Sequence, residues 1–593
     1  MKYFKYILPV LAIGALTTAC DDDDDNYGVL DGLGVVYRSQ TIAEGAHVPA
    51  NTTKGITLSY NNLIEIAPGA AITINGTPAT CHTEGMNLVF DLNLDPWTDY
   101  VIDIPAGALV RADDNTVGCE ARKVTFDTKT GINLATVDRA LINPNATQEA
   151  KDVYAKLLST YGKYTLSGLM NDEAWGSRYH EFVSGEIGKK TIIRGFDYGH
   201  LASSPSNWID YGDISAVQTA WNSGCIPQFQ WHWNVPVHGA YTYTAWKGDE
   251  AFTLTADNSL SLRDAEAKEA WKRAEEGGVI TIKYTVPAAE EGAEAAAASF
   301  AIANVDGESV ISSIVADDAN GTATVTLDAD MVKALKEQAL SLVGENAAVE
   351  SVEMTLQPSD ILAFYLTKEE DGVTYYNDFD AAKASEPGTW ENDIINADLQ
   401  KVAGYLKLLQ DAGIPVLWRP LHEAAGDYTN GAWFWWGAKG TEATKKLYLY
   451  MYDQLTNVYG LNNLIWVWTV DTTSAGQLIS PEEAAVGYPG DKYVDIVGTD
   501  IYPDSPFTDE HAKFDLVNAS AGYKKMVALT ECGNMVDPAS AWNNNGLWLY
   551  FMQWYDMDSE GNFGFNNYIG EQWTEIFNSP YVLDLDTQMS MNK

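Results

Sequence analysis

Hydrophobic and polar residues follow two different patterns along this chain. Between Gly34 and residue 128, short runs alternate apolar with polar positions, and Gly, Asn and Pro turns separate them. The clearest runs are Ile56–Tyr60, Ala71–Asn75, Leu88–Leu92 and Lys123–Asp127. A period of two is typical of strands with one buried face, so this pattern predicts an immunoglobulin-like β-sandwich over residues 34–128.

After Asn133 the chain changes to continuous apolar runs that alternate with helical stretches. Runs of this kind are typical of strands buried on both faces, and helices between them predict a parallel sheet. We find eight such runs within residues 135–246 and 362–588: Tyr164–Leu169, Thr191–Tyr198, Pro227–Trp233, Pro415–Glu423, Leu464–Asp471, Asp495–Tyr502, Met526–Cys532 and Leu549–Trp554. Eight strands with intervening helices predict an α/β fold of the (β/α)8 TIM-barrel type.

A long interval separates the third and fourth predicted strands, between Trp233 and Ile414. One helical crossover needs only a few dozen residues, so the interval predicts an inserted domain. Alternating runs place a second, smaller β-sandwich at about residues 247–361: Gly278–Tyr284, Ser299–Ala303, Ala323–Leu327 and Ser351–Leu356. Because it leaves the end of strand three, we expect it over the rim where barrels keep their sites, either extending the cleft or as a passive insertion.

The first twenty residues have the pattern of an export signal. Lys2 and Lys5 precede the apolar run Ile7–Leu16, which is too short to span a bilayer, and small residues then lead to Cys20. A cysteine at the cut point resembles a bacterial lipoprotein signal. The predicted linker, residues 21–33, begins with Asp21–Asp25 and resembles the acidic export tag of Bacteroidetes-type surface lipoproteins, with a solvated linker as the alternative. We therefore expect secretion and a lipid on Cys20 that anchors the protein in the outer membrane, facing the cell surface.

Charge narrows the range of partners. The 593 residues include 82 acidic and 37 basic side chains, for a formal charge of −45. Such an excess argues against nucleic acid or an anionic polysaccharide and favours a neutral substrate. The cysteines lack the close spacings of a zinc site. Cys81 and Cys119 share the first sandwich and either pair or stay free, whereas Cys225 and Cys532 are expected to be buried.

Two predicted barrel strands end in a glutamate. The fourth ends at Glu423 and the seventh reaches Glu531. Side chains at the C-terminal ends of barrel strands point to a shared mouth, so these two can converge. A carboxylic acid and a carboxylate about 5 to 5.5 Å apart can hydrolyse a glycosidic bond with retained configuration. Other acids at strand ends are the alternatives: Asp197, Asp471 and Asp500.

Short motifs around these glutamates are specific in combination. They are Arg419-Pro-Leu-His422-Glu423, Trp433-Phe-Trp-Trp-Gly437, Val494–Tyr502, Tyr161–Gly168, Gln230–Trp233 and Phe577–Leu583. Together they resemble glycoside hydrolase family 26, which is dominated by endo-β-1,4-mannanases. The resemblance extends from about Leu141 to Asp586, outside the insertion.

The resemblance implies a role for each matching residue. Glu423 corresponds to the general acid/base, Glu531 to the nucleophile, and Tyr502 to a tyrosine that hydrogen-bonds the nucleophile. His232 and His422 correspond to histidines that line the subsite where the bond is cut. Trp433 and Trp554 correspond to aromatic platforms there. The alternatives are a core position for Trp554 and a purely structural role for His422.

The two catalytic roles require different protonation states of the two glutamates. A general acid needs a raised pKa, which an apolar neighbour such as Trp433 can provide, whereas the nucleophile must stay ionised and accept hydrogen bonds. Arg419, four residues before Glu423, is expected to pair with the rim carboxylates. No cofactor and no metal are implied, because two carboxyl groups suffice.

The expected function is that of a retaining endo-β-1,4-mannanase that hydrolyses internal bonds of mannan, glucomannan or galactomannan. One alternative is a β-glycanase of the same family that acts on mixed-linkage β-glucan or β-1,3-xylan. Another is a non-catalytic surface glycan-binding protein. The expected partners are a neutral β-mannan-like polysaccharide and, through the lipid, the outer membrane, with no nucleic acid and a monomeric chain. The first sandwich is expected to be a spacer, with glycan binding as the alternative.

Overall fold

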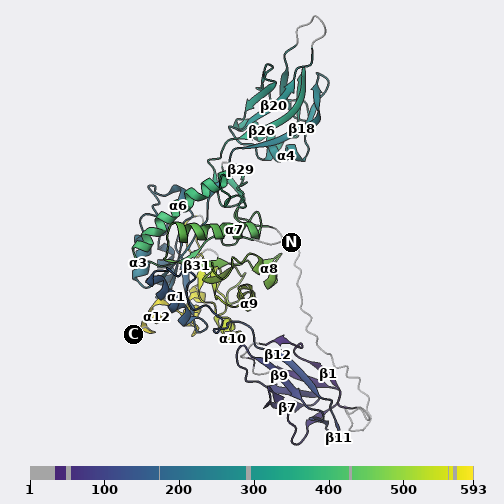
Figure 1. Ribbon diagram of the computed structural model, residues 1–593, viewed down its shortest axis with the longest axis vertical. Coiled ribbons are helices and arrows are strands. Elements are labelled where there is room, and N and C mark those ends of the chain that lie inside the picture. The colour runs from purple at the N-terminus through teal and green to yellow at the C-terminus, as the bar shows by residue number, and fades with distance from the viewer. Residues whose placement is uncertain are drawn as a thin grey trace. The chain divides into compact units, whose positions relative to one another are not determined.

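The structure is a computed structural model that describes residues 34–591, apart from residues 49–51, 53–54, 173, 289–295, 371, 426–430, 559 and 565–569. The predicted signal peptide, Cys20 and the acidic linker lie outside the described residues. The chain divides into two compact units, Met1–Thr130 and Gly131–Lys593. Each unit has its own hydrophobic core and is described by itself (Figure 1).

The first unit consists of short, mainly antiparallel sheets. One sheet has the order β1 (Tyr37–Gln40), β3 (Thr57–Tyr60), β8 (Asn87–Asp91), β7 (Thr80–Glu84), and another has β11 (Asp114–Gly118), β10 (Leu109–Arg111), β4 (Ile64–Ile66). The third has the order β2 (Ala46–His47), β12 (Arg122–Asp127), β9 (Asp99–Ile104), β5 (Thr73–Ile74), β6 (Thr77–Pro78), in which only the β2–β12 pair is parallel. Alternate residues such as Leu58, Phe90 and Ile102 fill the core.

The period-two pattern therefore predicts this unit's antiparallel sheets correctly, because alternate side chains are buried along strands such as β9. The immunoglobulin-like arrangement stays a prediction. Cys81 and Cys119 are both free thiols, so the disulfide left open above is not formed.

The second unit is built on a closed barrel of eight parallel strands. Their order is β14 (Gly168–Met170), β15 (Ile193–Asp197), β16 (Ile226–Gln230), β30 (Val416–Arg419), β31 (Leu464–Thr469), β34 (Ile496–Ile501), β35 (Met526–Cys532) and β36 (Phe551–Gln553). β14 pairs with β36 and closes the barrel. Each predicted apolar run supplies one of these strands, so the predicted barrel is confirmed. Within the first run, however, β13 (Thr165–Leu166) pairs outside the barrel with β37 (Val582–Leu583).

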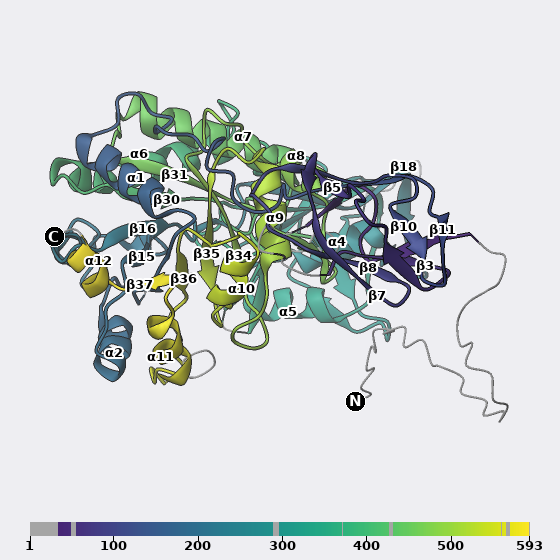
Figure 2. The same cartoon turned by 90° about the horizontal axis from the view of Figure 1, so that it is seen from below.

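Helices surround the barrel strands (Figure 2). They are α1 (Gln148–Thr160), α2 (Arg178–Ile187), α3 (Ser215–Asn222), α6 (Trp390–Asp411), α7 (Thr441–Tyr452), α8 (Pro481–Val486), α9 (His511–Ser520), α10 (Pro538–Asn543), α11 (Gly570–Asn578) and α12 (Leu585–Met591). The 3₁₀ turn η1 (Leu201–Ser203) and the π-helical segment η2 (Asp453–Val458), which continues α7, complete the set. Thr147 caps α1 by accepting a hydrogen bond from Ala150 N. Among the described residues, no helix is long and apolar enough to cross a membrane.

The insertion between β16 and β30 is a second antiparallel structure. One sheet has the order β18 (Tyr241–Leu254), β26 (Ala347–Leu356), β20 (Val279–Thr285), β24 (Thr322–Thr326), β23 (Val315–Asp317), and the other has β19 (Leu260–Leu262), β25 (Leu340–Glu345), β21 (Ser299–Ala303), β22 (Ser309–Ile311). Helices α4 (Ala265–Lys272) and α5 (Ala329–Glu337) pack on them. The four predicted strands coincide with β20, β21, β24 and β26, and the predicted start at residue 247 falls inside β18.

The two ends of the insertion meet beside the barrel. β17 (Val235–Pro236) precedes it and pairs antiparallel with β27 (Leu362–Ala363), which follows it. The chain then forms a hairpin of β28 (Thr367–Glu370) and β29 (Val373–Tyr376) before α6. A further small hairpin, β32 (Thr473–Ser474) and β33 (Gln477–Leu478), follows β31.

Candidate active site

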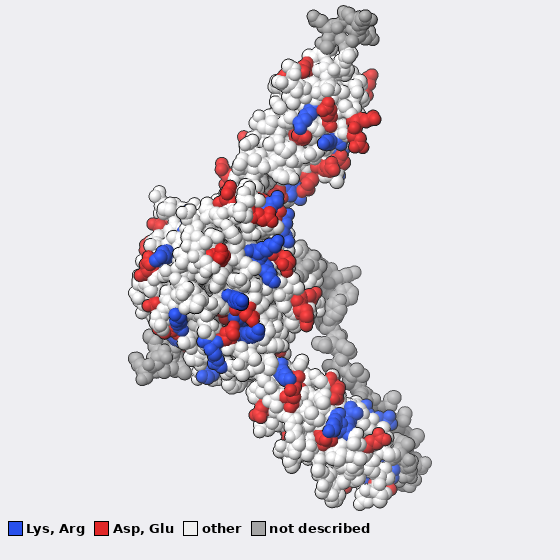
Figure 3. All heavy atoms as spheres, viewed as in Figure 1, with Lys and Arg blue, Asp and Glu red and all other residues white. Residues whose placement is uncertain are grey.

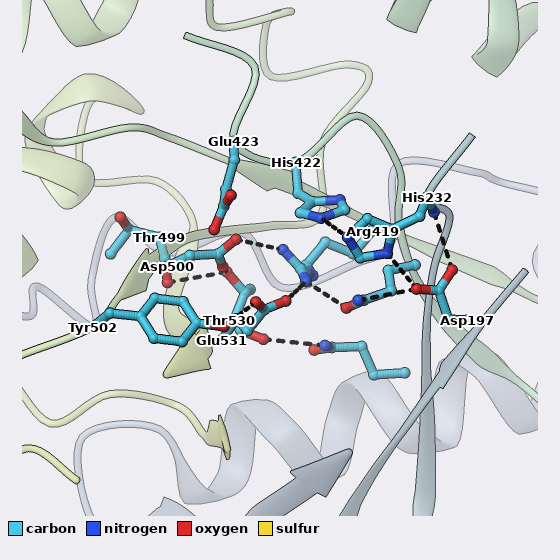
Figure 4. A network of polar contacts seen from close by, with 12 residues as sticks. Asp197, His232, Arg419, His422, Glu423, Thr499, Asp500, Tyr502, Thr530 and Glu531 are labelled. Atoms are coloured by element: carbon cyan, nitrogen blue, oxygen red, sulfur yellow. Dashed lines mark hydrogen bonds and ion pairs between the residues drawn. The ribbon is translucent and has the colours of Figure 1, made fainter. Parts of the chain in front are cut away.

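Two glutamates from different strands converge at the mouth of the barrel. Glu531 lies within β35, and Glu423 follows the end of β30. One carboxylate oxygen from each of Glu423, Asp500 and Glu531 lies within 4.8 Å of the other two. Figure 4 shows Glu423 pointing from its loop toward Asp500 and Glu531. This spacing is that of a retaining glycosidase, since an inverting enzyme needs about 6.5 to 9.5 Å to admit water between its carboxyl groups.

The backbone at Glu423 is strained in a way that serves this geometry. Glu423 has a φ of 49° and Leu421 a φ of 55°. Left-handed conformations cost a side-chain-bearing residue about 1 to 2 kcal/mol each, and such strain concentrates at functional sites. The sharp turn after β30 is what aims the Glu423 carboxyl group at the neighbouring strands instead of along its own.

Arg419 forms ion pairs with two of these carboxylates, Asp500 and Glu531. It lies at the end of β30 and is fully buried. Its Nη1 donates to Asp500 Oδ2 at 2.8 Å, and its Nη2 donates to Glu531 Oε2 at 2.5 Å and to Gln230 Oε1. A guanidinium fits this task because it stays charged and presents several donors in a fixed plane. The predicted pairing of Arg419 with rim carboxylates is therefore confirmed.

Tyr502 supplies a second donor to Glu531. It follows β34, and its hydroxyl donates to Glu531 Oε1. Burial and the negative charge of Glu531 raise the pKa of Tyr502 well above its usual value, so the hydroxyl keeps its proton. The two oxygens of Glu531 thus have different donors, Arg419 on one and Tyr502 on the other, which hold the carboxylate in one orientation.

Removing the Tyr502 hydroxyl should weaken catalysis without unfolding the protein. A hydrogen bond to a charged group contributes about 1.5 to 3 kcal/mol, so we expect Tyr502→Phe to lower kcat/KM by about ten- to a hundredfold. The ring remains, and half of it is exposed, so thermal stability should change little. Tyr241→Phe, at an exposed tyrosine of the inserted sandwich, is the control and should be neutral. Equal activities of the two variants would show that the hydroxyl does not act on Glu531.

Glu423 has the properties of a proton donor. Burial, together with the charges of Asp500, Glu531 and Asp471, raises the pKa of Glu423 to about 9. Trp433 contributes differently from the prediction: its indole Nε1 donates to Glu423 Oε2 at 2.9 Å, so it orients the carboxyl group as a polar partner instead of serving only as an apolar wall. The proton on Glu423 is therefore maintained by burial and by the neighbouring carboxylates.

Glu531 has different neighbours from Glu423. The pKa of Glu531 is also raised, because burial and Asp500 outweigh the opposing effects of Arg419, Tyr502 and His232. Among the described residues, Arg419 forms ion pairs with Asp500 and Glu531 but not with Glu423. The ionised form of Glu531 is therefore the one that direct contact with a cation stabilises, and the pKa of about 9 favours the proton on Glu423. This division of one acid and one carboxylate is the arrangement that retaining hydrolysis requires.

These pKa directions predict the pH profile of activity. The acid must be protonated, so kcat/KM should fall as pH rises through about 9, the pKa of Glu423. It should also fall at low pH, where Glu531 takes up a proton. The profile of kcat/KM on a neutral oligosaccharide gives both limbs, and Glu423→Gln should lose the alkaline one. An alkaline limb near pH 5 in the wild type would contradict a raised pKa at Glu423.

The two predicted histidines lie together beside this pair. His422 Nε2 is 3.3 Å from His232 Nε2, and His232 Nδ1 bonds Asp197 Oδ2. Burial opposes the charge on His232, but Asp197 outweighs it and raises the pKa, whereas burial and Arg419 lower the pKa of His422 well below its usual value. A protonated His232 can therefore donate to a neutral His422. The two predicted histidines, His232 and His422, therefore lie side by side. Asp197, one of the alternative acids, orients His232.

Aromatic side chains form one wall of the site. Trp554 lies with its ring 5.6 Å from that of His232 and lines a cavity of about 190 Å³. Trp433 is 39% exposed beside Glu423, as a platform requires. The same cavity is lined by residues that sequence reasoning missed: Met170, Asn234, Phe364, Tyr365 and Tyr555. Phe364 and Tyr365 follow the predicted end of the insertion, residue 361, by three and four positions. Two adjacent aromatic residues at the return to the barrel were the sequence signal that could have identified them.

The alternative acids have supporting positions. Asp500 accepts from Arg419 and from Thr530 Oγ1 at 2.8 Å. Asp471 accepts from Ala425 N at 2.8 Å, and its charge contributes to the raised pKa of Glu423. Among the described residues, Glu423, Asp500 and Glu531 are the group whose oxygens are close enough to hold a metal ion. Arg419 already supplies a positive charge to two of them, so a metal there would compete with its guanidinium.

A parallel barrel with an acid and a carboxylate facing each other at its mouth defines a glycoside hydrolase. The sequence profile named Glycosyl hydrolase family 26 matches residues 142–253 and 370–587, and the gap between these ranges falls in the insertion. The match covers more than half of the chain. The chain therefore belongs to glycosyl hydrolase family 26.

Curated proteins and a solved structure are similar to parts of this chain. A mannan endo-1,4-beta-mannosidase of Thermothelomyces thermophilus is 38% identical over 35% of this chain and 39% of its own length. The mannan endo-1,4-beta-mannosidase A of a Piromyces species is 34% identical over 38% of this chain and 34% of its own. The chain thus spans two fifths or less of these curated relatives. A ruminal GH26 endo-beta-1,4-mannanase of known structure has a TM-score of 0.50 at 21% identity, covers 93% of this chain and 92% of its own, and shares the fold.

Proposed function

We propose that this protein is a retaining endo-β-1,4-mannanase that hydrolyses internal β-1,4-mannosidic bonds of mannan, glucomannan or galactomannan. The observation that carries the proposal is the pair Glu423 and Glu531, whose carboxylate oxygens lie within 4.8 Å. Arg419 and Tyr502 bind Glu531, whereas burial and nearby carboxylates raise the pKa of Glu423 to about 9. The substrate class rests on the relatives, several of which are named mannan endo-1,4-beta-mannosidases.

The proposed reaction has two steps. Glu531, held by Arg419 and Tyr502, attacks the anomeric carbon while Glu423 gives its proton to the departing glycosidic oxygen. The sugar is then bound covalently to Glu531, and the freed chain end leaves. Glu423, now ionised, takes a proton from a water that attacks the same carbon, which restores both groups and retains the configuration. Two displacements at one carbon require the closely spaced carboxyl groups seen at the barrel mouth.

Substrate is the part of the proposal that needs a direct test. The protein lacking residues 1–20 is incubated with linear mannan, galactomannan, mixed-linkage β-glucan and β-1,3-xylan, and reducing ends and product lengths are followed. Rapid appearance of short oligosaccharides from the mannans alone supports the proposal. Release from another glycan only would keep the mechanism and replace the substrate, and retention on a mannan gel with no release from any would favour a glycan-binding protein.

We also propose that the protein is lipid-anchored at Cys20 and faces the cell surface. The support is the signal-like segment before Cys20 and the five aspartates after it. Mass spectrometry of the N-terminal peptide from membranes should show a lipid-modified cysteine, and protease added to intact cells should remove the protein. Cys20→Ser should release the protein from the membrane fraction. An unmodified Cys20 on a membrane-free protein would refute this anchor.

A further inference from the structure

A second hollow of the barrel unit lies apart from the active site. Its volume is about 500 Å³, within the range of about 300 to 1,000 Å³ that small-ligand sites occupy. Residues from the end of β19, from α4, from α5 with the residues after it, and from β29 line this hollow. Among the described residues, it has no lining residue in common with the active-site cavity that Trp554 lines. It is therefore a separate place on the molecule.

Basic side chains dominate the lining, and we call this place the basic hollow. Its basic residues are Arg263, Lys268, Lys272 and Lys336, and its one acid is the exposed Glu337. The chain as a whole has 82 acidic and only 37 basic side chains. Figure 3 shows acidic and basic side chains interspersed over the face in view. Four bases with one acid therefore depart from the general distribution of charge on this protein.

The acids near α4 already have other partners. Arg273, the residue that ends α4, forms ion pairs with Glu269 and Asp378. Glu275 lies 3.1 Å from His238. Among the described residues, the four basic side chains of the hollow form no ion pair of their own. Their charge is therefore free to act on an anion.

Neutral groups hold two of these bases in place. Arg263 donates to Leu340 O at 3.2 Å and to Ser341 Oγ at 3.0 Å. Lys336 Nζ donates to Thr374 O at 3.2 Å, which joins α5 to β29. Carbonyl and hydroxyl oxygens fix the position of a cation without cancelling its charge. The two bases are thus oriented in advance, as a binding site requires.

The two lysines of α4 add charge to the same side of the hollow. Lys268 and Lys272 are four residues apart and so lie on one face of the helix. Lys272 Nζ lies 4.0 Å from the centre of the Tyr376 ring, which keeps its ammonium group over β29. Like charges one turn apart repel each other, and an anion that binds both would relieve this repulsion.

Lys336 has the strongest need of a negative partner. It is partly buried, and burial lowers its pKa although the charges of Glu275 and Glu369 oppose this. A carboxylate beside its ammonium group would stabilise the charged form.

The size and the surface of the hollow narrow the class of anion. Four cations spread over three elements suit a ligand with more than one negative charge, and a single small ion would leave most of the volume empty. Leu262, Leu335 and Tyr376 also line the hollow and offer apolar surface to carbon atoms. A saccharide whose sugars have carboxylate groups has both properties, because the ring presents C–H groups and the acid presents charge.

The net charge of the chain does not prevent such binding. The formal charge of −45 argues against an anionic polysaccharide as a partner of the whole surface. At physiological ionic strength, however, charges are screened beyond about 8 Å, so the groups that line a hollow decide what it binds.

We propose that the basic hollow binds a short acidic saccharide, whose carboxylate groups pair with Arg263, Lys272 and Lys336 and whose sugar rings pack on Tyr376. The inserted sandwich is then a binding module for an acidic glycan, attached to a barrel that acts on a neutral one. This binding is independent of which glycan the barrel cleaves.

The first experiment compares an acidic ligand with its uncharged counterpart. The protein lacking residues 1–20 is titrated by calorimetry with linear trigalacturonic acid, and separately with its methyl ester, which keeps the sugar skeleton without the charge. We expect the acid to bind, with an affinity that falls as ionic strength rises, and the ester to bind at least about tenfold more weakly. Equal affinities for both, or no binding of the acid, overturn the proposal.

A matched pair of variants locates the site. Lys268→Gln/Lys272→Gln removes two exposed charges from the hollow, and Lys123→Gln/Lys407→Gln removes two exposed charges elsewhere. We expect the first variant to bind the acid about tenfold more weakly, since each exposed ion pair contributes modestly, and the second to bind like the wild type. Equal losses in the two variants would mean that net charge alone attracts the acid, which overturns the site.

Protection of lysines gives a readout that needs no variant. Acetic anhydride modifies accessible ammonium groups, and mass spectrometry measures the reaction at each lysine. We expect trigalacturonic acid to protect Lys272 and Lys336 and to leave Lys123 as reactive as before. Unchanged reactivity of Lys272 and Lys336 with the ligand bound would place the ligand elsewhere and overturn the proposal.

Two further ligands test the chemical class. Inorganic phosphate and a short poly-aspartate peptide are titrated under the same conditions. Weaker binding of both than of trigalacturonic acid supports a saccharide ligand. Tighter binding of phosphate, or of the peptide, overturns the saccharide and identifies the hollow as a site for a small oxyanion or for an acidic protein segment.

Discussion

Glu531→Gln is expected to lower kcat on the proposed mannan oligosaccharide substrates by on the order of 10⁴-fold, because an amide cannot displace the leaving sugar or carry it as an ester. The variant should stay folded. Glutamine has the shape of glutamate, and its oxygen can still accept from Arg419, which keeps its pair with Asp500. Turnover, circular dichroism and the melting temperature together give both parts of this result.

The control and a chemical rescue make this prediction specific. Glu442→Gln, at an exposed position in the first turn of α7, should leave activity intact. In Glu531→Ala, added azide has room to attack the anomeric carbon from the nucleophile's side, and the product should have inverted configuration. A Glu531→Gln enzyme with near-normal turnover would remove Glu531 from the nucleophile role.

Glu423→Gln is expected to lower kcat/KM by about 10² to 10⁴-fold on natural oligosaccharides, because the departing sugar oxygen then leaves without a proton. The loss should be much smaller on a dinitrophenyl glycoside, whose leaving group needs no proton, and the enzyme should then accumulate as the glycosyl intermediate. Azide should speed release from that intermediate in Glu423→Ala and give a product of retained configuration. Equal losses on both substrates would argue against Glu423 as the acid.

The same substitution should stabilise the fold near neutral pH. The pKa of Glu423 is about 9 in the folded chain and about 4.3 for an ordinary glutamate, so at pH 7 the folded form holds a proton that the unfolded form has lost. The free energy of unfolding contributed by this group is therefore complete below about pH 4 and declines as pH rises toward 9. Glu423→Gln, which cannot ionise, should melt at a higher temperature than wild type at pH 7 and at a similar one at pH 4.

The barrel was predictable because its signal is local. A strand covered on both faces must be apolar at consecutive positions, and all six residues of β31 are buried accordingly. The C-terminal end of such a run also lies at the mouth of the barrel, where the site is expected. Glu423 and Glu531 could therefore be chosen as candidate catalytic residues from the sequence alone. The first run shows the limit of this reasoning. Its two halves, β13 and β14, are both buried, and only their pairing partners separate them.

Tyr365 shows why some site residues were missed. It lies near enough to Glu423 and Glu531 for their charges to raise its pKa only because β27 pairs with β17 and closes the insertion at its base. No local pattern encodes that pairing, since it joins segments separated by more than a hundred residues. The hydrogen bond from Trp433 to Glu423 was missed for a similar reason: a sequence reveals an aromatic residue but not whether its N–H contacts a carboxylate.

By itself, the sequence determined the parallel barrel, the position of the insertion and the two glutamates, because apolar periodicity and strand ends are properties of neighbouring residues. Only the tertiary structure decided which glutamate holds the proton. That choice follows from Arg419 and Tyr502 lying on Glu531, and from burial and three carboxylates surrounding Glu423. Electrostatic energies depend on distances and burial in three dimensions, and those distances come into existence only when the strands close into a barrel.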